Sequence, residues 1–280
     1  MKFSILIANY NNGKYFEDCY KSILLQNYEN WEAVIVDDAS TDNSIEIIKQ
    51  LIHNDSRFLL FENSKNEGVG FTKAKLIDLA KGEICGYLDP DDTLGSNALQ
   101  ASINTFTKNK KVVLTYSRLV KCDENLNPIS EFKSAMQVPN GDACFFNCPI
   151  QIAPFVAFKK SVYEQCEKMN PEFRIAEDQD LYYKMYEKGN VKYIDQADYF
   201  YRSHQGGISQ NENKQSSYEY WAKVIFSAMK RRNLKTINGK KIPEKFTNSE
   251  EIFSLLAYQN SISYRIKKKL KILFQSLFHS

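Results

Sequence analysis

Residues 84–93 read Ile84-Cys85-Gly86-Tyr87-Leu88-Asp89-Pro90-Asp91-Asp92-Thr93, a short apolar run that ends in three carboxylates within four positions. The apolar part is continuous, which is typical of a strand covered on both faces in a parallel sheet. Adjacent carboxylates repel one another unless a cation, hydrogen bonds or water separate them. Ligands of open α/β sheets bind beyond the carboxyl ends of the strands. The stretch therefore predicts either a divalent-cation site for a phosphorylated ligand or an acidic turn that caps the next helix.

The sequence around this stretch alternates between predicted strands and predicted helices. Strands are expected at residues 3–8, 33–36, 58–61 and 112–116, and helices at residues 16–24, 45–51, 71–81 and 94–108. Such an alternation is typical of a doubly wound, mainly parallel α/β sheet. No internal repeat or low-complexity linker interrupts it, so this half is expected to form one unit.

The second half has a looser pattern. After a proline-containing stretch at residues 119–155, we expect strands at 153–159, 191–194 and 199–201 and helices at 160–169 and 176–188. A polar run at residues 209–217 then precedes a helical stripe. We place a domain boundary near residue 212. The catalytic domain is thus predicted at residues 1–212, with halves 1–118 and 119–212, and a helical C-terminal extension at residues 213–280.

The composition of the chain argues against some classes of function. The 280 residues are 43% hydrophobic and 25% charged, which is typical of a globular protein, and the net charge of +3 does not indicate a nucleic-acid partner. No apolar run approaches the roughly 18 residues of a membrane span. The N-terminus passes directly into a predicted strand without a cleavage region, so we expect a cytosolic protein. The six scattered cysteines predict reduced thiols rather than a zinc site or disulfides.

A loop at residues 66–73 contains Gly68 and Gly70 and leads into a predicted helix. It lacks the third glycine of the dinucleotide fingerprint and the Gly-Lys-Ser/Thr end of a P-loop. Helix N-termini attract anions, and Lys73 adds a positive charge there. The loop is therefore either a phosphate contact or a turn whose glycines supply positive φ angles.

Several other polar residues allow two interpretations each. Asp38 ends the strand predicted next to the first one, so it either accepts a hydrogen bond from a nucleobase or caps a helix. Tyr10 either stacks on that base or is an ordinary loop aromatic. Glu177 and Asp178 open a helix, where an acid interacts favourably with the helix dipole or serves as a general base. His204 is either a metal ligand or a plain hydrogen-bonding residue.

Together these motifs strongly resemble those of family 2 glycosyltransferases with the GT-A fold. The resemblance covers roughly residues 1–210 and rests on Tyr10, Val36-Asp37-Asp38-Ala39-Ser40-Thr41-Asp42, Asn66-x-Gly68, Leu88-Asp89-Pro90-Asp91-Asp92, Glu177-Asp178-x-Asp180-Leu181 and Tyr201-Arg202-x-His204. It implies inverting transfer of a sugar from a nucleotide-sugar, with UDP favoured and with Mg²⁺ or Mn²⁺ on the diphosphate.

The resemblance also implies how the donor is bound. Asp38 would bind the base with the help of the Tyr10 loop, and Asn66 lies in the donor-binding loop. Lys73 stands where the family often has an arginine, so it would make a single contact to the diphosphate rather than a bidentate one.

The remaining roles implied by the resemblance concern the metal and the proton. Asp89 and Asp91 form the D-x-D motif, in which Asp89 supports the loop and Asp91 lies near the ribose and the metal. Asp92 is the residue expected to contact the metal directly, with His204 as a further metal or phosphate contact. Asp178 would be the base that takes the proton of the acceptor hydroxyl group.

The C-terminal segment, residues 262–280, combines two kinds of side chain at helical spacing. The basic ones are Arg265, Lys267, Lys268, Lys269 and Lys271, and the apolar ones are Ile262, Ile266, Leu270, Leu273, Phe274, Leu277 and Phe278. Such a helix is typical of one that lies on an anionic membrane surface. A helix docked on its own catalytic domain, or on another subunit of a homo-oligomer, would account for the pattern equally well.

The sequence thus predicts a cytosolic, membrane-peripheral sugar transferase that acts on a glycan or lipid-linked acceptor in cell-surface polysaccharide biosynthesis. Two alternatives stay open. A sugar nucleotidyltransferase would share the sheet and an acidic metal site, but it usually carries a glycine- and lysine-rich loop after the first strand, which residues 9–14 do not resemble. A catalytically inactive sugar-binding relative would not need Asp91, Asp92 and Asp178.

Overall fold

The computed structural model describes residues 1–173, 175–204 and 214–278. Its central sheet has the strand order β3-β2-β1-β4-β8-β6-β9-β5, and β7 pairs with β6. The strands of this sheet are β1 Phe3–Asn9, β2 Trp31–Asp37, β3 Phe58–Glu62, β4 Ile84–Tyr87, β5 Thr93–Leu94, β6 Val112–Cys122, β7 Pro128–Glu131, β8 Val156–Lys159 and β9 Asn190–Arg202.

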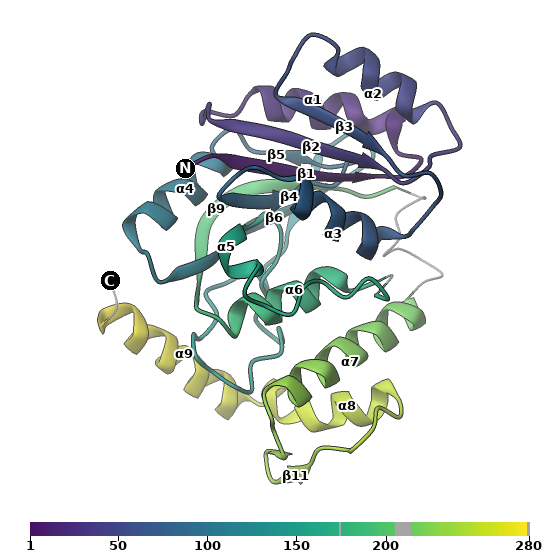
Figure 1. The fold of residues 1–280 in the computed structure, drawn as a ribbon. Coiled ribbons are helices and arrows are strands. Elements are labelled where there is room, and N and C mark those ends of the chain that lie inside the picture. The colour runs from purple at the N-terminus through teal and green to yellow at the C-terminus, as the bar shows by residue number, and fades with distance from the viewer. Residues whose placement is uncertain (174, 205–213, 279–280) are drawn as a thin grey trace.

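The first four strands form a parallel, doubly wound unit, as the alternating pattern predicts. β1 pairs in parallel with β2 and β4, and β2 pairs in parallel with β3. Helices α1, α2 and α4 cover one face of the sheet, and α3, α5 and α6 lie on the other (Figure 1). These helices are α1 Phe16–Leu24, α2 Ser44–Ile52, α3 Val69–Leu79, α4 Ala98–Lys108, α5 Lys160–Tyr163 and α6 Glu177–Tyr186. Because both faces are covered, the strands consist of continuous apolar runs.

The second half of the sheet is mixed in direction. β8 runs antiparallel to both β4 and β6, whereas β6 and β9 are parallel to each other. Residues 191–194 and 199–201, predicted as separate strands, belong to the single strand β9. The polar residues between them hide this continuity in the sequence, yet the ladder to β6 continues and Asp195 forms an ion pair with Arg118 at 3.1 Å. The helix predicted at residues 160–169 is a single turn, α5.

The C-terminal helices extend the core instead of standing apart from it. They are α7 Lys214–Arg231, α8 Ser249–Leu256 and α9 Ile262–Phe278, with the short hairpin β10 Thr236–Ile237 and β11 Lys240–Lys241 before α8. Phe146, Phe173 and Tyr183 pack in one buried cluster with apolar side chains of α7 and α8. Residues on both sides of the boundary predicted at residue 212 therefore share one core. Within the described ranges, no helix combines the length and the apolar character that crossing a membrane requires.

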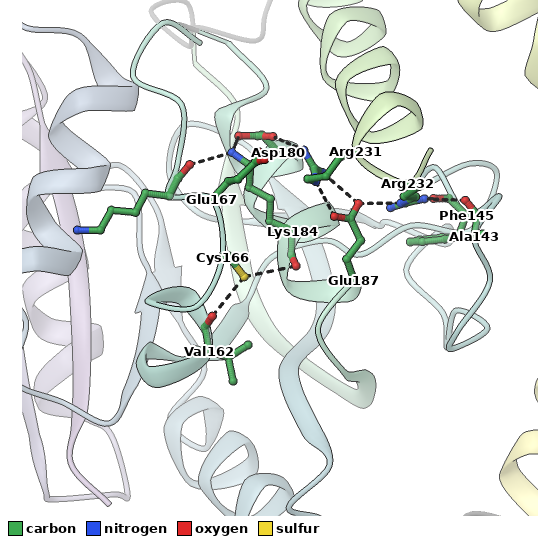
Figure 2. A network of polar contacts seen from close by, with 11 residues as sticks. Ala143, Phe145, Val162, Cys166, Glu167, Asp180, Lys184, Glu187, Arg231 and Arg232 are labelled. Atoms are coloured by element: carbon green, nitrogen blue, oxygen red, sulfur yellow. Dashed lines mark hydrogen bonds and ion pairs between the residues drawn. The ribbon is translucent and has the colours of Figure 1, made fainter. Parts of the chain in front are cut away.

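A polar network joins the end of α6 to the end of α7 (Figure 2). Glu187 accepts hydrogen bonds from Arg231 and from Arg232, the latter at 2.7 Å. The buried carboxylate of Asp180 forms an ion pair with Lys184 at 2.6 Å and lies 3.9 Å from Arg231. Since α6 begins with Glu177 and Asp178, this network fixes the helix that presents those two acids.

Candidate active site

The turn after β4 holds the three acids of the opening stretch. Asp92 is 1% exposed, and its Oδ1 accepts a hydrogen bond of 2.8 Å from the backbone N–H of Arg202 on β9. The Tyr199 hydroxyl hydrogen-bonds with the carboxyl group of Asp92 and accepts a 3.3 Å hydrogen bond from the backbone N–H of Asp89. Burial, followed by the charges of Asp91 and Asp89, raises the pKa of Asp92 well above its usual value. The contacts of Asp92 thus fasten the turn to β9.

Asp91 points towards a different group. Its Oδ2 lies 2.8 Å from Nε2 of His204, whose ring packs against the ring of Tyr15 with centroids 4.7 Å apart. The guanidinium group of Arg202 lies on the same tyrosine, donates a 2.7 Å hydrogen bond to the backbone carbonyl of Asp91 and bonds with Asp18 at 2.7 Å. Tyr15 and Arg202 therefore hold Asp91 and His204 against each other.

The donor atoms at this turn fit a hard divalent cation. A carboxylate oxygen and an imidazole nitrogen converge at Asp91 and His204, and carboxylates are the preferred protein ligands of Mg²⁺ and Mn²⁺. Among the described residues, no group of three or more His, Cys, Asp or Glu side chains is arranged to hold a metal ion.

Asp38 shapes the loop that leads into α3. Its carboxylate accepts hydrogen bonds from the backbone N–H groups of Glu67 and Gly68, both at 2.9 Å, and from the amide of Asn63 at 2.7 Å. Gly68 has a φ angle of 91°, which side-chain-bearing residues rarely adopt. Asn66 lies exposed in this loop. Asp38 thus has local partners that sequence reasoning did not foresee.

Tyr10 lies beside Asp38 at the carboxyl end of the sheet. It follows Asn9, and the carbonyl of Asn9 accepts a 2.8 Å hydrogen bond from the backbone N–H of Asp38. The Tyr10 side chain is 45% exposed. An exposed aromatic ring next to a loop held by a carboxylate is a surface on which a planar base can stack.

Lys73 pairs with an acid on the opposite side of the site. Its Nζ donates a 2.6 Å hydrogen bond to Oε1 of Glu177, and both side chains are buried. Burial alone would lower the pKa of Lys73, but the charges of Glu177, Asp89 and Asp178 outweigh it and raise that pKa. Lys73 stays positively charged and links α3 to the first turn of α6.

Asp178 lies within the electrostatic influence of Glu177, Lys73 and Asp89. Burial, and then the charge of Glu177, raise the pKa of the Asp178 carboxyl group to about 6, while Lys73 and a 2.8 Å hydrogen bond from the Gln179 N–H act in the opposite direction. The charge of Asp89 also raises this pKa. Asp178 and the acidic turn therefore lie close enough to influence each other's ionisation.

The structure brings most of the predicted residues to one end of the sheet. Sequence reasoning missed the contacts of Glu177, Tyr15 and Tyr199. A buried lysine requires an anionic partner, so Lys73, which lies near the start of α3, gave the available signal for the Lys73–Glu177 pair. No comparable signal existed for Tyr15 or Tyr199, whose contacts join distant parts of the chain.

Comparison with known proteins agrees with this geometry. The chain matches the model of glycosyl transferase family 2 over residues 4–166. It is 29% identical over 201 residues to a chondroitin synthase of Escherichia coli, covering 70% of this chain and 28% of the synthase. The chain spans half or less of the length of the first curated relatives it matches.

Two solved structures share the fold. S. aureus TarS 1–349 in complex with UDP-GlcNAc superposes with a TM-score of 0.68 at 18% identity, covering 94% of this chain and 74% of TarS. A mannosyltransferase from Pyrobaculum calidifontis in complex with GDP-Man and Mn²⁺ gives a TM-score of 0.60 at 13% identity, covering 99% and 87%. The predicted GT-A fold with a helical C-terminal region is confirmed, and the chain belongs to the family 2 glycosyltransferases.

Proposed function

We propose that this protein is an inverting, metal-dependent glycosyltransferase that moves a sugar from a nucleotide-sugar to a hydroxyl group of a glycan or lipid-linked acceptor in polysaccharide biosynthesis. One observation carries the proposal. Asp178, whose pKa is raised to about 6, lies within electrostatic reach of the acidic turn that contains Asp89. A base with a pKa near 6 beside a turn proposed to bind a cation is an arrangement suited to glycosyl transfer from a nucleotide diphosphate.

The donor is proposed to lie across the carboxyl ends of β1, β2 and β4. Tyr10 stacks on the base, Asp38 and the loop with Asn66 recognise its edge, and Lys73 contacts the diphosphate. The ammonium group of Lys73 has three N–H donors, so it could turn one of them from Glu177 to a phosphate oxygen of the donor. A UDP-sugar is the favoured donor, and the likeness to TarS bound to UDP-GlcNAc supports that choice.

The cation is proposed to sit at Asp91 and His204. When bound, Mg²⁺ or Mn²⁺ neutralises charge on the leaving diphosphate. For Asp92 the contacts favour a role other than the direct metal contact that the family resemblance implies. Its carboxyl group is buried and bonded to Arg202 and Tyr199, so we propose that it holds the turn while Asp91 faces the ion.

Asp178 is proposed as the general base. Its carboxylate takes the proton of the acceptor hydroxyl group as that oxygen attacks the anomeric carbon from the face opposite the leaving diphosphate. A single displacement with one base inverts the anomeric configuration and needs no covalent enzyme nucleophile. The lipid-linked form of the acceptor and a place of action at the inner face of a membrane are proposed from the basic amphipathic character of residues 262–280.

The Asp178→Asn variant tests the assignment of the base. Loss of a general base costs about 10²–10⁴-fold in rate, so we expect transfer to fall by that factor while donor binding persists. Asp195→Asn is the matched control, because Asp195 is 77% exposed and its contacts with Arg118 and with the Tyr193 hydroxyl group lie at the protein surface. Full transfer activity of Asp178→Asn would refute the assignment of Asp178 as the base. A product that NMR shows to retain the anomeric configuration would refute the single displacement.

A further inference from the structure

Helix α9 exposes the apolar side chains that a docked helix would normally bury. Ile262, Ile266 and Leu270 follow one another at intervals of four residues and are 77%, 54% and 60% exposed. On a helix of 3.6 residues per turn, these positions form one stripe along one side. We call these three residues the apolar stripe.

The opposite side of α9 binds the rest of the protein through polar groups. The backbone N–H of Asn140 donates a 3.0 Å hydrogen bond to the side chain of Gln275, which in turn donates a 2.9 Å bond to the Asn140 carbonyl. Lys268 is 4% exposed and lies over the Phe145 ring at 5.1 Å. Lys271 lies 3.9 Å from Asp142.

The apolar stripe is turned away from the protein. A surface helix of a globular protein usually turns its apolar stripe to the core and its polar face to water. Here the docked face carries Lys268 and Gln275, together with Tyr264 against the ring of Tyr258 and the half-buried Ile272. Attachment to the protein's own loop at residues 140–148 therefore does not explain the apolar stripe. The stripe needs a second, apolar partner.

Charge identifies the kind of partner. Exposed Arg265 and Lys269 lie along one edge of the apolar stripe, and exposed Lys267 and Lys271 lie along the other, while residues 262–278 contain no acidic side chain. An apolar row between two cationic edges fits the interface of an anionic bilayer, where acyl chains lie below the phosphates. Two copies of α9 packed stripe to stripe would bring these same cations together.

We propose that α9 docks the protein on an anionic lipid bilayer, with the apolar stripe inserted among the acyl chains and Arg265, Lys267 and Lys269 at the level of the phosphates, while Lys271 keeps its contact with Asp142. The proposal deepens the proposed function and rests on it in one respect: docking would bring the active site to a membrane-held acceptor. Lipid binding itself does not depend on transfer.

Vesicle flotation with the full-length protein tests the proposal. We expect binding to vesicles of phosphatidylglycerol and phosphatidylcholine, and little binding to phosphatidylcholine alone. Ile266→Ser with Leu270→Ser should abolish flotation. Lys267→Gln with Lys269→Gln should weaken it about 25-fold, since each cation near the surface contributes about fivefold. Ile129→Ser on β7, where the side chain is 66% exposed, is the control and should float like the native protein.

All these substitutions are at exposed positions other than the contacts that dock α9, so we expect the thermal unfolding midpoint to be unchanged. Equal binding to neutral vesicles, no flotation of the native protein, or full flotation of the Ile266→Ser/Leu270→Ser variant would overturn the proposal. So would a concentration-dependent dimer, measured by light scattering, that this variant dissociates. Vesicle binding without any glycosyl transfer would refute the proposed function and leave the bilayer surface standing.

Discussion

At the scale of the residue, the ionisation of Asp178 is set by two neighbours of opposite charge. Burial and the carboxylate of Glu177 raise its pKa to about 6, and the ammonium group of Lys73 lowers it. A base works only when it is deprotonated. For the base proposed here, burial and the balance between Glu177 and Lys73 therefore set the pH at which Asp178 would accept a proton.

We expect kcat/KM for transfer to rise about tenfold per pH unit below a midpoint near 6 and to level off above it. Glu177→Gln removes a negative charge, lowers the pKa of Asp178 and moves the acidic limb to lower pH. Lys73→Met removes a positive charge and moves the limb to higher pH. Initial rates across pH 4.5–8.5 measure both shifts. Shifts in the same direction would show that the pair acts only structurally.

The two adjacent acids of the turn are expected to respond differently to the same substitution. Asp91→Asn removes a proposed ligand, so Mn²⁺ affinity should fall by more than the roughly 10–100-fold that loss of an outer-sphere partner costs. Asp92→Asn keeps an oxygen for the Arg202 N–H and should retain Mn²⁺ binding. Titration of Mn²⁺ in the presence of UDP, followed by electron paramagnetic resonance, measures this. Loss of the ion in Asp92→Asn alone would return the ligand role to Asp92.

At the scale of the element, α6 carries the proposed base at its first turn and is fastened at its far end to α7. The fastening depends on Glu187, which holds Arg231 and Arg232 together (Figure 2). A catalytic side chain keeps its position best when the helix that carries it is held by such rigid contacts.

Glu187→Gln should destabilise the protein by about 2–3 kcal/mol, because it removes the carboxylate partner of Arg232 and leaves Arg231 with only its longer contacts to Asp180 and Glu167. For a protein of this size that corresponds to a fall of about 5 °C in Tm. The control is Glu131→Gln, in which a half-exposed carboxylate loses a surface pair with Arg118 and which should cost less than about 1 kcal/mol. Calorimetry that gave equal values for the two variants would contradict the anchoring role.

The elements that sequence predicted well are those whose pattern is local. The parallel strands of the first half were predicted to within a few residues, because each is an apolar run bounded by loop residues. β9 was split in two because three of the four residues 195–198 are polar, and their place in the sheet depends on pairing with β6. The antiparallel direction of β8 is likewise a long-range property that no local pattern contains.

The site divides in the same way. Acids at the ends of neighbouring strands could be placed together from topology alone, which led to Asp38 and the turn with Asp91. The Lys73–Glu177 pair joins residues 104 positions apart, and the division of labour between Asp91 and Asp92 depends on which way the turn faces β9. Neither the pair nor this division of labour could be inferred without the three-dimensional structure.

At the scale of the whole molecule, the C-terminal helices complete the half of the protein that presents Asp178. α7 and α8 cover Phe146, Phe173 and Tyr183, the last of which lies on α6 itself. α9, by contrast, contacts the protein through polar side chains along one face. The two parts of the extension are therefore expected to differ in what their removal does.

A chain ending at residue 261 should fold and bind donor like the chain of residues 1–280, because it loses only the contacts of α9 with residues 140–148 and with residues 257–260. A chain ending at residue 212 should aggregate, since it exposes the cluster around Tyr183 to water. Circular dichroism and size-exclusion chromatography compare the two. A stable, donor-binding chain of residues 1–212 would instead support an independent catalytic domain.

Release of free nucleoside diphosphate from a panel of UDP- and GDP-sugars tests the proposed metal-dependent sugar transfer. With Mn²⁺ present, we expect release from at least one UDP-sugar. This release should be abolished by a chelator and by Asp91→Asn, and it should be slower by about 10²–10⁴-fold in Asp178→Asn when an acceptor is supplied. Release unaffected by the chelator, or no binding and no turnover with any donor of the panel, would contradict the proposed transfer.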